Sequence, residues 1–500
     1  MKIIRHILAL ELMLCANWAA AAPLFNQFAD KNSAPSNPAQ VADLAAEKAT
    51  ATTAKEIDAS SIDDALSDDY LLANVDQLEE LLGTMVLLGN TENLAHYLSL
   101  YEQVERRDES LIDWGNALLA SKGGDLKRGI ALYRKIHSAL PELLMVRFQL
   151  AVALFQDRQY IAAQSEFEKL RSAQLPEVYL QVIDQYLEAI VKKNAWEFDF
   201  FATSVYNKNI NNAPPEDTKI TLPNGSTLTS TNKPQKAVGL KLGLNAEKRW
   251  NLYDNWFAKT EINGNGAAYI GSGKNNNELT ARLGAGVGYA NATSEVSLTP
   301  YVSRRWFMNK YEDKLPNNKT NTRYQFEPYN YSFGVRLDGN QWLSPNLRYQ
   351  GALDWSHTRY QAGYENNNGN DYSFSNSLLY MQSPQQYWVL GVNLGRKNVQ
   401  SDSLSYKRIG ASIGWGQEWH KGISTRANLS FARKNYDGVD FLNIKKKNNE
   451  WDVSLSVWNR NWYFWGITPR LTWQYNRVSS NHAFYNYDGN NVFLEFSKSF

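Results

Sequence analysis

Two periodicities divide this chain into two regions. From about Ile62 to Lys193, apolar residues recur three and four positions apart, as in Leu144, Phe148, Ala151 and Phe155. That spacing predicts amphipathic helices. From Trp196 onward, apolar and polar residues alternate, which is typical of strands with one apolar and one polar face. The pattern therefore predicts an all-α domain followed by an antiparallel β domain.

The helical region repeats with a period of 34 residues. The matching pairs are Ala117 and Ala151, Gly129 and Ala163, Tyr133 and Phe167, and Ile136 and Leu170. Gly83, Ala95 and Ser99 continue the period upstream, more weakly. Small residues at two points and an aromatic residue four beyond the second suit tetratricopeptide (TPR) repeats, in which helix pairs nest on their neighbours. We predict about three repeats and a final helix from Pro176 to Lys193; an ordinary helical bundle is the alternative.

A TPR-like solenoid presents a concave surface that binds a peptide or protein. In the repeat register, the candidate client-binding positions of this groove are Trp114, Lys122, Phe148 and Gln156. The alternative for Trp114 and Phe148 is that their rings pack the solenoid.

The alternating region predicts a transmembrane β-barrel of about fourteen strands. The strands are about ten or more residues long, enough to cross a bilayer when tilted. Long Asn-rich connections alternate with short turns, and an even strand number puts both barrel ends in the periplasm and the long loops outside. The expected strands begin near Trp196, Lys236, Asn255, Glu278, Ser294, Thr322, Asn346, Asp371, Gln385, Leu404, Gly422, Asn449, Gly466 and Asn490.

Side chains on the two predicted barrel faces have different expected roles. Tryptophans near strand ends suit an interfacial aromatic belt, namely Trp250, Trp256, Trp342, Trp419, Trp462 and Trp465. On the polar face, the candidate lumen-lining residues are Arg282, Arg336, Arg408 and Arg470. Their alternative role is to form salt bridges inside the lumen with residues such as Glu261, Asp338 and Asp354.

The N-terminus predicts export from the cytoplasm. Lys2 and Arg5 precede an apolar stretch and the small residues up to Ala22, which together predict a signal peptide over 1–22. Residues 23–60 read as a flexible linker, 61–194 as a periplasmic TPR-like domain and 195–500 as the outer-membrane barrel. The single cysteine, Cys15, lies in the signal, so neither a disulfide framework nor a thiolate metal site is expected.

Composition adds to the barrel prediction. The chain has 16 Trp and 13% aromatic residues with a mean hydropathy of −0.49, a mix that a barrel with aromatic girdles and a polar lumen explains. Its net charge of +1 gives no bulk attraction to nucleic acid. Lys445, Lys446 and Lys447 form a charge run that we expect to be solvated outside the cell, with a contact to lipopolysaccharide phosphates as the alternative.

No motif in the sequence indicates an enzyme. H-E-x-x-H, G-x-S-x-G and Walker A patterns are absent. His357 stands near Ser356 and Asp354, but alternation places Asp354 and Ser356 toward the lumen and His357 toward lipid. We therefore expect no catalytic, cofactor-binding or metal-binding residues.

A TPR-like region followed by a barrel of about fourteen strands ending in Phe500 resembles the surface lipoprotein assembly modulator (Slam) family. The resemblance rests on architecture and on the Trp- and Tyr-rich strands over about 62–500. It implies capture of specific surface lipoproteins, or related secreted proteins, in the periplasm and their export across the outer membrane. The partners implied are the client, periplasmic chaperones, the Bam machinery and outer-membrane lipid. A TPR-barrel polysaccharide exporter and a porin-like channel remain the alternatives.

Overall fold

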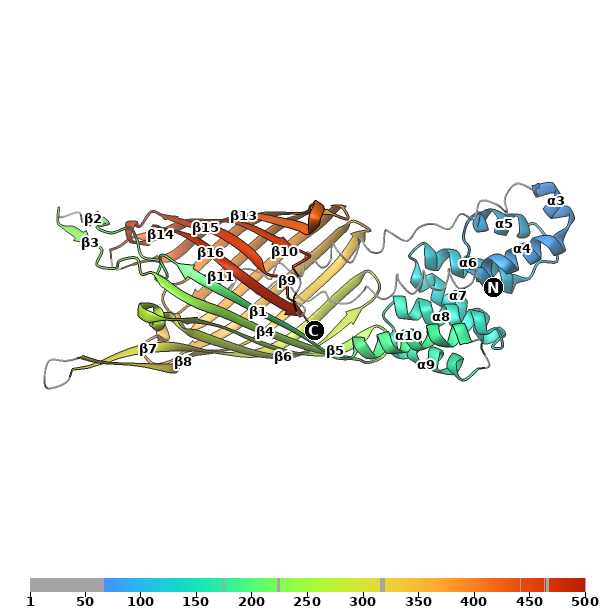
Figure 1. Ribbon diagram of the computed structural model, residues 1–500, viewed down its shortest axis with the longest axis horizontal. Helices are drawn as coiled ribbons and strands as arrows, with labels where there is room; N and C mark the ends of the chain where they lie inside the picture. Colours follow the sequence, from blue (N-terminus) through green and yellow to red (C-terminus); the bar gives the residue numbers. More distant parts are fainter. Residues whose placement is uncertain are drawn as a thin grey trace.

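The computed structural model describes residues 67–499 except 174, 176, 223–224, 315–319, 441, 463 and 465–466. The predicted signal peptide and linker, Trp465 and Phe500 lie outside the described residues. A helical domain stands at one end of a β-barrel, and the chain passes directly from the last helix into the first strand (Figure 1). The two predicted fold classes are therefore confirmed in the predicted order.

Helices occupy the chain up to Lys193. Aspartates begin two of them, because the Asp108 carboxylate accepts from Ser110 N at 2.8 Å and the Asp125 carboxylate accepts from Arg128 N at 3.1 Å. Gly89 ends another with a φ of 69°. The helices are α3 (Asp68–Ala73), α4 (Val75–Leu88), α5 (Leu94–Tyr101), α6 (Glu109–Lys122), α7 (Leu126–Ala139), α8 (Leu144–Gln156), α9 (Tyr160–Arg171) and α10 (Glu177–Lys193).

The 34-residue repeat appears as two stacked helix pairs, α6–α7 and α8–α9. Every residue of the matching pairs is buried where its helix meets its neighbours: Ala117 and Ala151, Gly129 and Ala163, Tyr133 and Phe167, and Ile136 and Leu170. Small residues allow the helices to approach closely; a Cβ added to Gly115 would lie 2.7 Å from a methyl group of Leu98. The upstream pair, α4–α5, is shorter in its second helix, which explains its weaker match to the repeat.

The barrel closes through fourteen antiparallel strands, with β1 hydrogen-bonded to both β4 and β16. The short strands β2 (Lys219–Thr221) and β3 (Thr227–Thr229) form a separate hairpin in the first long connection. The barrel strands are β1 (Trp196–Asn207), β4 (Ala237–Asn251), β5 (Trp256–Tyr269), β6 (Glu278–Ala290), β7 (Ser294–Lys314), β8 (Thr320–Ser344), β9 (Leu347–Tyr360), β10 (Gly369–Ser383), β11 (Gln386–Val399), β12 (Tyr406–Glu418), β13 (Ile423–Val439), β14 (Lys445–Asn459), β15 (Arg470–Ser480) and β16 (Tyr487–Ser499).

Observed strand starts agree closely with the predicted ones, and the largest differences are at Asn449 and Gly466. There the strands begin at Lys445 and Arg470 instead. More residues separate β14 from β15 (460–469) than separate the other strand pairs joined at this end of the barrel, and Phe464 and Ile467 form an isolated bridge between these two strands. The prediction of short turns at this end is therefore wrong at that one connection.

The long loops and the helical domain lie at opposite ends of the barrel (Figure 1). The β2–β3 hairpin and the extended β7–β8 hairpin project from the end away from the helices. Connections at the helical end include 252–255, 291–293 and 345–346, which are short. Within the helices that the structure describes, none combines the length and the apolar character needed to cross a membrane.

The outer surface of the barrel is apolar, and the inner surface is polar. Leu279, Leu283 and Val287 of β6 are exposed, whereas Arg282 between them turns inward. Such an outer face is suited to lipid. The expected aromatic belt is exposed at Trp250, Trp256, Trp419 and Trp462. Trp342 departs from the expectation, because it pairs in register with the buried Arg348 and its ring therefore turns to the interior.

Candidate functional site at the junction of the helices and the barrel

The turn between α8 and α9 carries the helical side of the junction. It contains Asp157, Arg158 and Gln159. Arg158 has a φ of 62°, a left-handed conformation that is uncommon for residues other than glycine. One repeat earlier, 34 residues upstream, the same turn position is Gly124 with a φ of 90°. The chain thus places an arginine where the repeat geometry favours glycine, which points to a role for its side chain.

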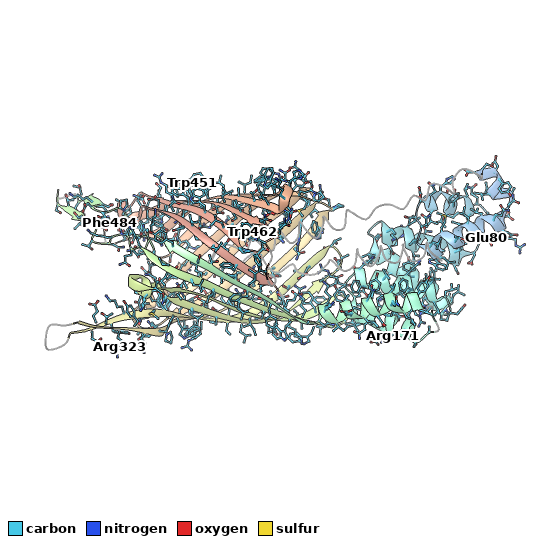
Figure 2. All side chains as sticks on the ribbon, viewed as in Figure 1. Glu80, Arg171, Arg323, Trp451, Trp462 and Phe484 are labelled. Carbon is cyan, nitrogen blue, oxygen red and sulfur yellow. The ribbon has the colours of Figure 1, made fainter. Side chains whose placement is uncertain are left out.

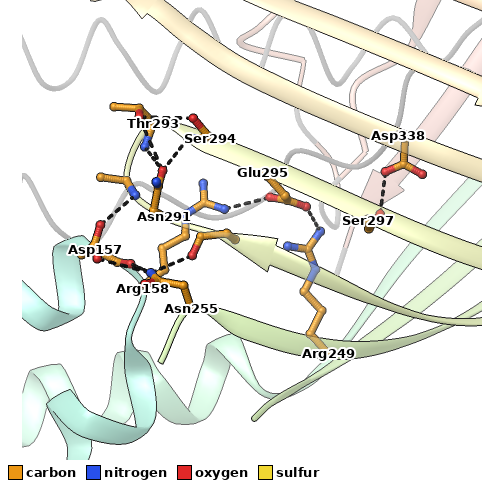
Figure 3. A network of polar contacts seen from close by, with 12 residues as sticks. Asp157, Arg158, Arg249, Asn255, Asn291, Thr293, Ser294, Glu295, Ser297 and Asp338 are labelled. Atoms are coloured by element: carbon orange, nitrogen blue, oxygen red, sulfur yellow. Dashed lines mark hydrogen bonds and ion pairs between the residues drawn. The ribbon is translucent and has the colours of Figure 1, made fainter. Parts of the chain in front are cut away.

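Arg158 forms an ion pair with the barrel (Figure 3). Its Nη1 lies 2.8 Å from Oε2 of Glu295, at the start of β7. The other oxygen of Glu295 lies 2.8 Å from Nη2 of Arg249 on β4. Only 8% of the Glu295 side chain is exposed, so solvent screens these pairs weakly. One carboxylate therefore joins the helical domain to two barrel strands.

Asp157 supplies a second set of contacts to the barrel turns. Asn255, in the β4–β5 turn, donates from Nδ2 to the carbonyl oxygen of Asp157 and, at 3.0 Å, to that of Ala290. The backbone N–H of Ala292 lies 3.5 Å from the Asp157 carboxylate, and its side chain packs against the helical core. Since the β4–β5 and β6–β7 turns both take part, the helical domain is attached to one side of the barrel mouth.

The polar network continues from the junction along the inner wall of the barrel. Ser297, two residues after Glu295, donates to Asp338 of β8 at 2.8 Å (Figure 3). Lys259 of β5 lies 2.6 Å from Glu261 and 3.8 Å from Asp338. This wall, directly beyond the attached helices, thus carries a hydrogen bond between the neighbouring strands β7 and β8 and an ion pair from β5 to β8.

The predicted lumen arginines belong to such ion pairs. Arg336 lies 3.3 Å from Asp338 and 3.7 Å from Asp354. Arg282 lies 3.6 Å from Asp354. Of the partners expected for these arginines, Glu261 instead pairs with Lys259. The salt-bridge alternative therefore accounts for the observed contacts of Arg282 and Arg336.

The other two predicted arginines lie on the far part of the wall. Arg408 of β12 lies 3.1 Å from Glu450 and donates to the Asn393 side chain at 2.6 Å. The guanidinium of Arg470, at the start of β15, lies 4.3 Å from the ring centre of Trp458. Arg282 and Arg336 thus share Asp354 on one part of the wall, and Arg408 and Arg470 lie elsewhere, so that the four arginines do not form one site.

The catalytic elements considered from the sequence do not meet. Asp354 accepts a hydrogen bond from the Tyr301 hydroxyl at 2.7 Å on the inner face. His357 turns outward, where its ring contacts that of Phe333 and its Nδ1 lies 3.1 Å from Asn370. Among the described residues, no group of histidine, cysteine, aspartate and glutamate side chains could hold a metal ion.

Two family models match this architecture domain by domain. One, described as "Surface lipoprotein assembly modifier", matches residues 196–500, and the other, described as its N-terminal TPR repeats, matches residues 65–167. The chain belongs to the surface lipoprotein assembly modifier family. It is therefore an outer-membrane protein, with the helical domain in the periplasm and the long loops at the cell surface.

Curated relatives in the family extend over most of the chain. A surface lipoprotein assembly modifier 2 of Haemophilus influenzae is 37% identical over 82% of this chain and 82% of its own length. A surface lipoprotein assembly modifier of Pasteurella multocida is 36% identical over 79% of this chain and 77% of its own length. Surface lipoprotein assembly modifiers are transport and assembly proteins and not a known class of enzyme.

The four predicted groove residues of this family member fall into two classes. Trp114 and Phe148 are buried in the helical core: the Trp114 indole donates to Gln149 at 2.5 Å, and the Phe148 ring lies 6.2 Å from the Phe167 ring. Their burial supports the packing alternative. Lys122 and Gln156 stand at equivalent helix ends, 34 residues apart, where Lys122 is exposed and Gln156 is half-buried.

Sequence reasoning missed the junction residues of the surface lipoprotein assembly modifier fold. The repeat register contained a signal, because it aligned Gly124 with Arg158 and thus marked an arginine at a glycine position. Nothing local to Glu295, Arg249 or Asn255 indicated a partner. Their role depends on where the helical domain rests on the barrel.

Proposed function

We propose that this chain captures specific surface lipoproteins, or related secreted proteins, in the periplasm and exports them to the cell surface through its barrel. The observation that carries the proposal is the direct attachment of the repeat domain to the barrel mouth by Arg158 and Glu295. A client bound in the solenoid is thereby held beside the entrance that it must pass.

The junction supports a hand-off between two parts of one molecule. A client held next to the mouth has a high local concentration there, so that its transfer into the barrel does not depend on a second encounter in solution. The mostly buried carboxylate of Glu295 bridges Arg158 and Arg249 with one oxygen each and so fixes the direction in which the solenoid faces. We infer that periplasmic chaperones deliver the client and that the Bam machinery inserts the barrel, as expected for this family.

Export is tested in cells that express the gene together with an epitope-tagged surface lipoprotein encoded beside it. Antibody labelling of intact cells should fall to background when the gene is deleted and return with the full-length chain. The Glu295→Gln chain, at equal abundance in the outer membrane, should restore labelling only partly. Unchanged labelling after deletion of the gene would contradict the export proposal. Full restoration of labelling by the Glu295→Gln chain would contradict the proposal that the client passes directly from the solenoid to the barrel.

A further inference from the structure

The lysine run at 445–447 divides between the two faces of the barrel. Lys446 is buried on the inner side, where its Nζ lies 4.3 Å from the Tyr436 ring centre and 4.1 Å from that of Tyr485. Lys445 and Lys447 are exposed on the outer side. The run is therefore not a solvated loop, because it begins β14, and alternation turns two of its three cations toward the membrane.

Neighbouring strands place more cations beside these two lysines. Asn435 of β13 pairs in register with Lys407 on one side and with Lys447 on the other. Arg433, two residues before Asn435, pairs with Asn449, and residues two apart on one strand share a face. We name Lys407, Arg433, Lys445 and Lys447 the outer basic patch; all four are exposed.

The charge of the outer basic patch is not neutralised within the described chain. No ion pair or side-chain hydrogen bond joins its four side chains to the described residues. Asp437 lies on the same outer face, but its carboxylate forms an ion pair of 2.5 Å with Arg396, which is not part of the patch. Asp488 of β16, two strands beyond β14, pairs in register with another exposed cation, Arg477 of β15. Adjacent cations repel one another, so this arrangement favours an anion that bridges them.

Directly below the patch the outer surface becomes apolar. Ile409 and Trp451 are exposed, two residues nearer the membrane centre than Lys407 and Asn449. Figure 2 shows Trp451 toward the end of the barrel that is away from the helices, which is the end at the cell surface. Cations thus stand above apolar side chains where the outer leaflet meets water, as an amphiphile with phosphate groups and acyl chains requires.

We propose that the outer basic patch binds the phosphate groups of lipid A in the outer leaflet, with the acyl chains lying on the apolar surface below. Lysine and arginine are both phosphate binders, and several of them close together hold one polyanion more tightly than scattered cations do. The site is independent of the export function. It would fix the rotation and depth of the β12–β14 side of the barrel in the membrane.

The test uses the purified full-length chain in detergent, titrated with bisphosphorylated lipid A. The variant Lys407→Gln/Arg433→Gln/Lys447→Gln removes the centre of the patch. Its matched control is Lys219→Gln/Arg304→Gln/Arg323→Gln, which removes three exposed cations that no register pairing places side by side, because Lys219 lies in the β2–β3 hairpin, Arg304 pairs with Tyr331 and Arg323 pairs with Tyr311. We expect the patch variant to bind lipid A about tenfold or more weakly, and the control variant to bind as the unmodified chain does.

Two further probes decide whether the phosphates and lipid A are recognised. Lipid A without phosphates should bind weakly and equally to the patch variant and the unmodified chain. Phosphatidylglycerol should compete poorly with lipid A. The proposal is overturned by a patch variant with unchanged affinity, by an equal loss in the control variant, or by phosphatidylglycerol that competes mole for mole. Resistance to SDS before heating shows that each barrel is folded.

Discussion

Arg158 and Glu295, which are 137 residues apart in the sequence, form an ion pair of 2.8 Å that connects a helical turn to a barrel strand. The backbone of Arg158 is in the left-handed region, so the contact is made at a conformational cost. The neighbouring Arg249 also binds Glu295, and the carboxylate therefore has a partner on each side of the junction.

Arg158→Gly should loosen the attachment while relieving the backbone strain in the turn. Glycine adopts a positive φ without penalty, so the helical domain should stay folded and gain up to about 1 kcal/mol in stability. Spin labels at Gln164→Cys and Tyr253→Cys measure the distance between the two parts. We expect a broader distance distribution for Arg158→Gly, whereas Arg158→Lys should stay closer to the unmodified chain. An unchanged distribution would show that other contacts set the geometry.

Glu295→Gln should weaken the junction more than the removal of Arg158 does. The amide removes the charge that the two guanidinium groups share; Arg249 keeps Glu247 at 2.6 Å, whereas Arg158 loses its ion pair to the barrel, and breaking such a buried pair typically costs about 2–5 kcal/mol. The same spin-label distances and the surface labelling of a client report the effect. The control is Glu188→Gln, which breaks an exposed pair with Lys192 in α10 and should change neither measurement.

Ala117→Leu should destabilise the helical domain and leave the barrel intact. Ala117 is fully buried at the point where neighbouring helices approach, and added methylenes there force the helices apart at a cost of about 1–3 kcal/mol. Urea unfolding of the full-length chain, followed by far-UV circular dichroism, separates the helical transition from that of the barrel. Ile161→Ala, at an exposed position of α9, is the control and should shift the midpoint little.

His137 should make the helical domain less stable in mild acid. Burial, followed by the nearby positive charge of Arg147, lowers the pKa of His137 below its usual value of 6.5. Glu166 opposes this shift and Lys169 adds to it. The folded state therefore binds the proton of His137 more weakly than the unfolded state does. The neutral His137 thus favours the folded state fully above pH 6.5, and this contribution to the free energy of unfolding is lost as the pH falls toward the lowered pKa.

The measurement for His137 is the urea midpoint of the helical transition between pH 7.5 and pH 5. A His137→Gln chain should lose part of the decrease that the unmodified chain shows, since the glutamine cannot take up the proton. Equal pH slopes for the two chains would assign the acid sensitivity to other groups.

Asp354→Asn should weaken the wall of the barrel. Asp354 is the shared carboxylate of Arg282 and Arg336 and accepts from the Tyr301 hydroxyl, so its loss leaves buried cations with less compensation. The temperature at which the folded barrel loses its resistance to SDS should fall. His357→Gln, three residues farther on the outer face, should leave that temperature nearly unchanged. An equal fall in both would indicate a general effect of altering β9.

The strand pattern shows why so much of the barrel could be predicted. Alternation is a property of each strand alone. The sequence of β6 therefore predicts that Leu279, Leu283 and Val287 share the outer face, and this prediction needs no information about the other strands. Turn signals limited each start to within a few residues. The two largest differences have different causes. At Lys445 the strand begins earlier than predicted, because its first residues are polar and resemble a loop. At Arg470 the strand begins later than predicted, because the preceding turn is apolar and resembles a strand.

The candidate groove shows the limit of the same reasoning. The repeat register correctly aligned Trp114 with Phe148 and Lys122 with Gln156. A register shows which positions of two repeats correspond, but it does not show which of their side chains are exposed to solvent. Burial of the two rings depends on Gln149, Phe167 and the neighbouring helices, which contact them from other turns of the chain.

The sequence by itself determined the two domains, the repeat, the closed barrel and its orientation, because each follows from a short-range period or from the lengths of connections. Only the tertiary structure decided that Arg158 meets Glu295, that Arg336 meets Asp354, and that Lys407, Arg433 and Lys447 share one patch. These relationships join residues whose distance in space depends on strand order, register and the seating of one domain on the other, and no local pattern contains that information.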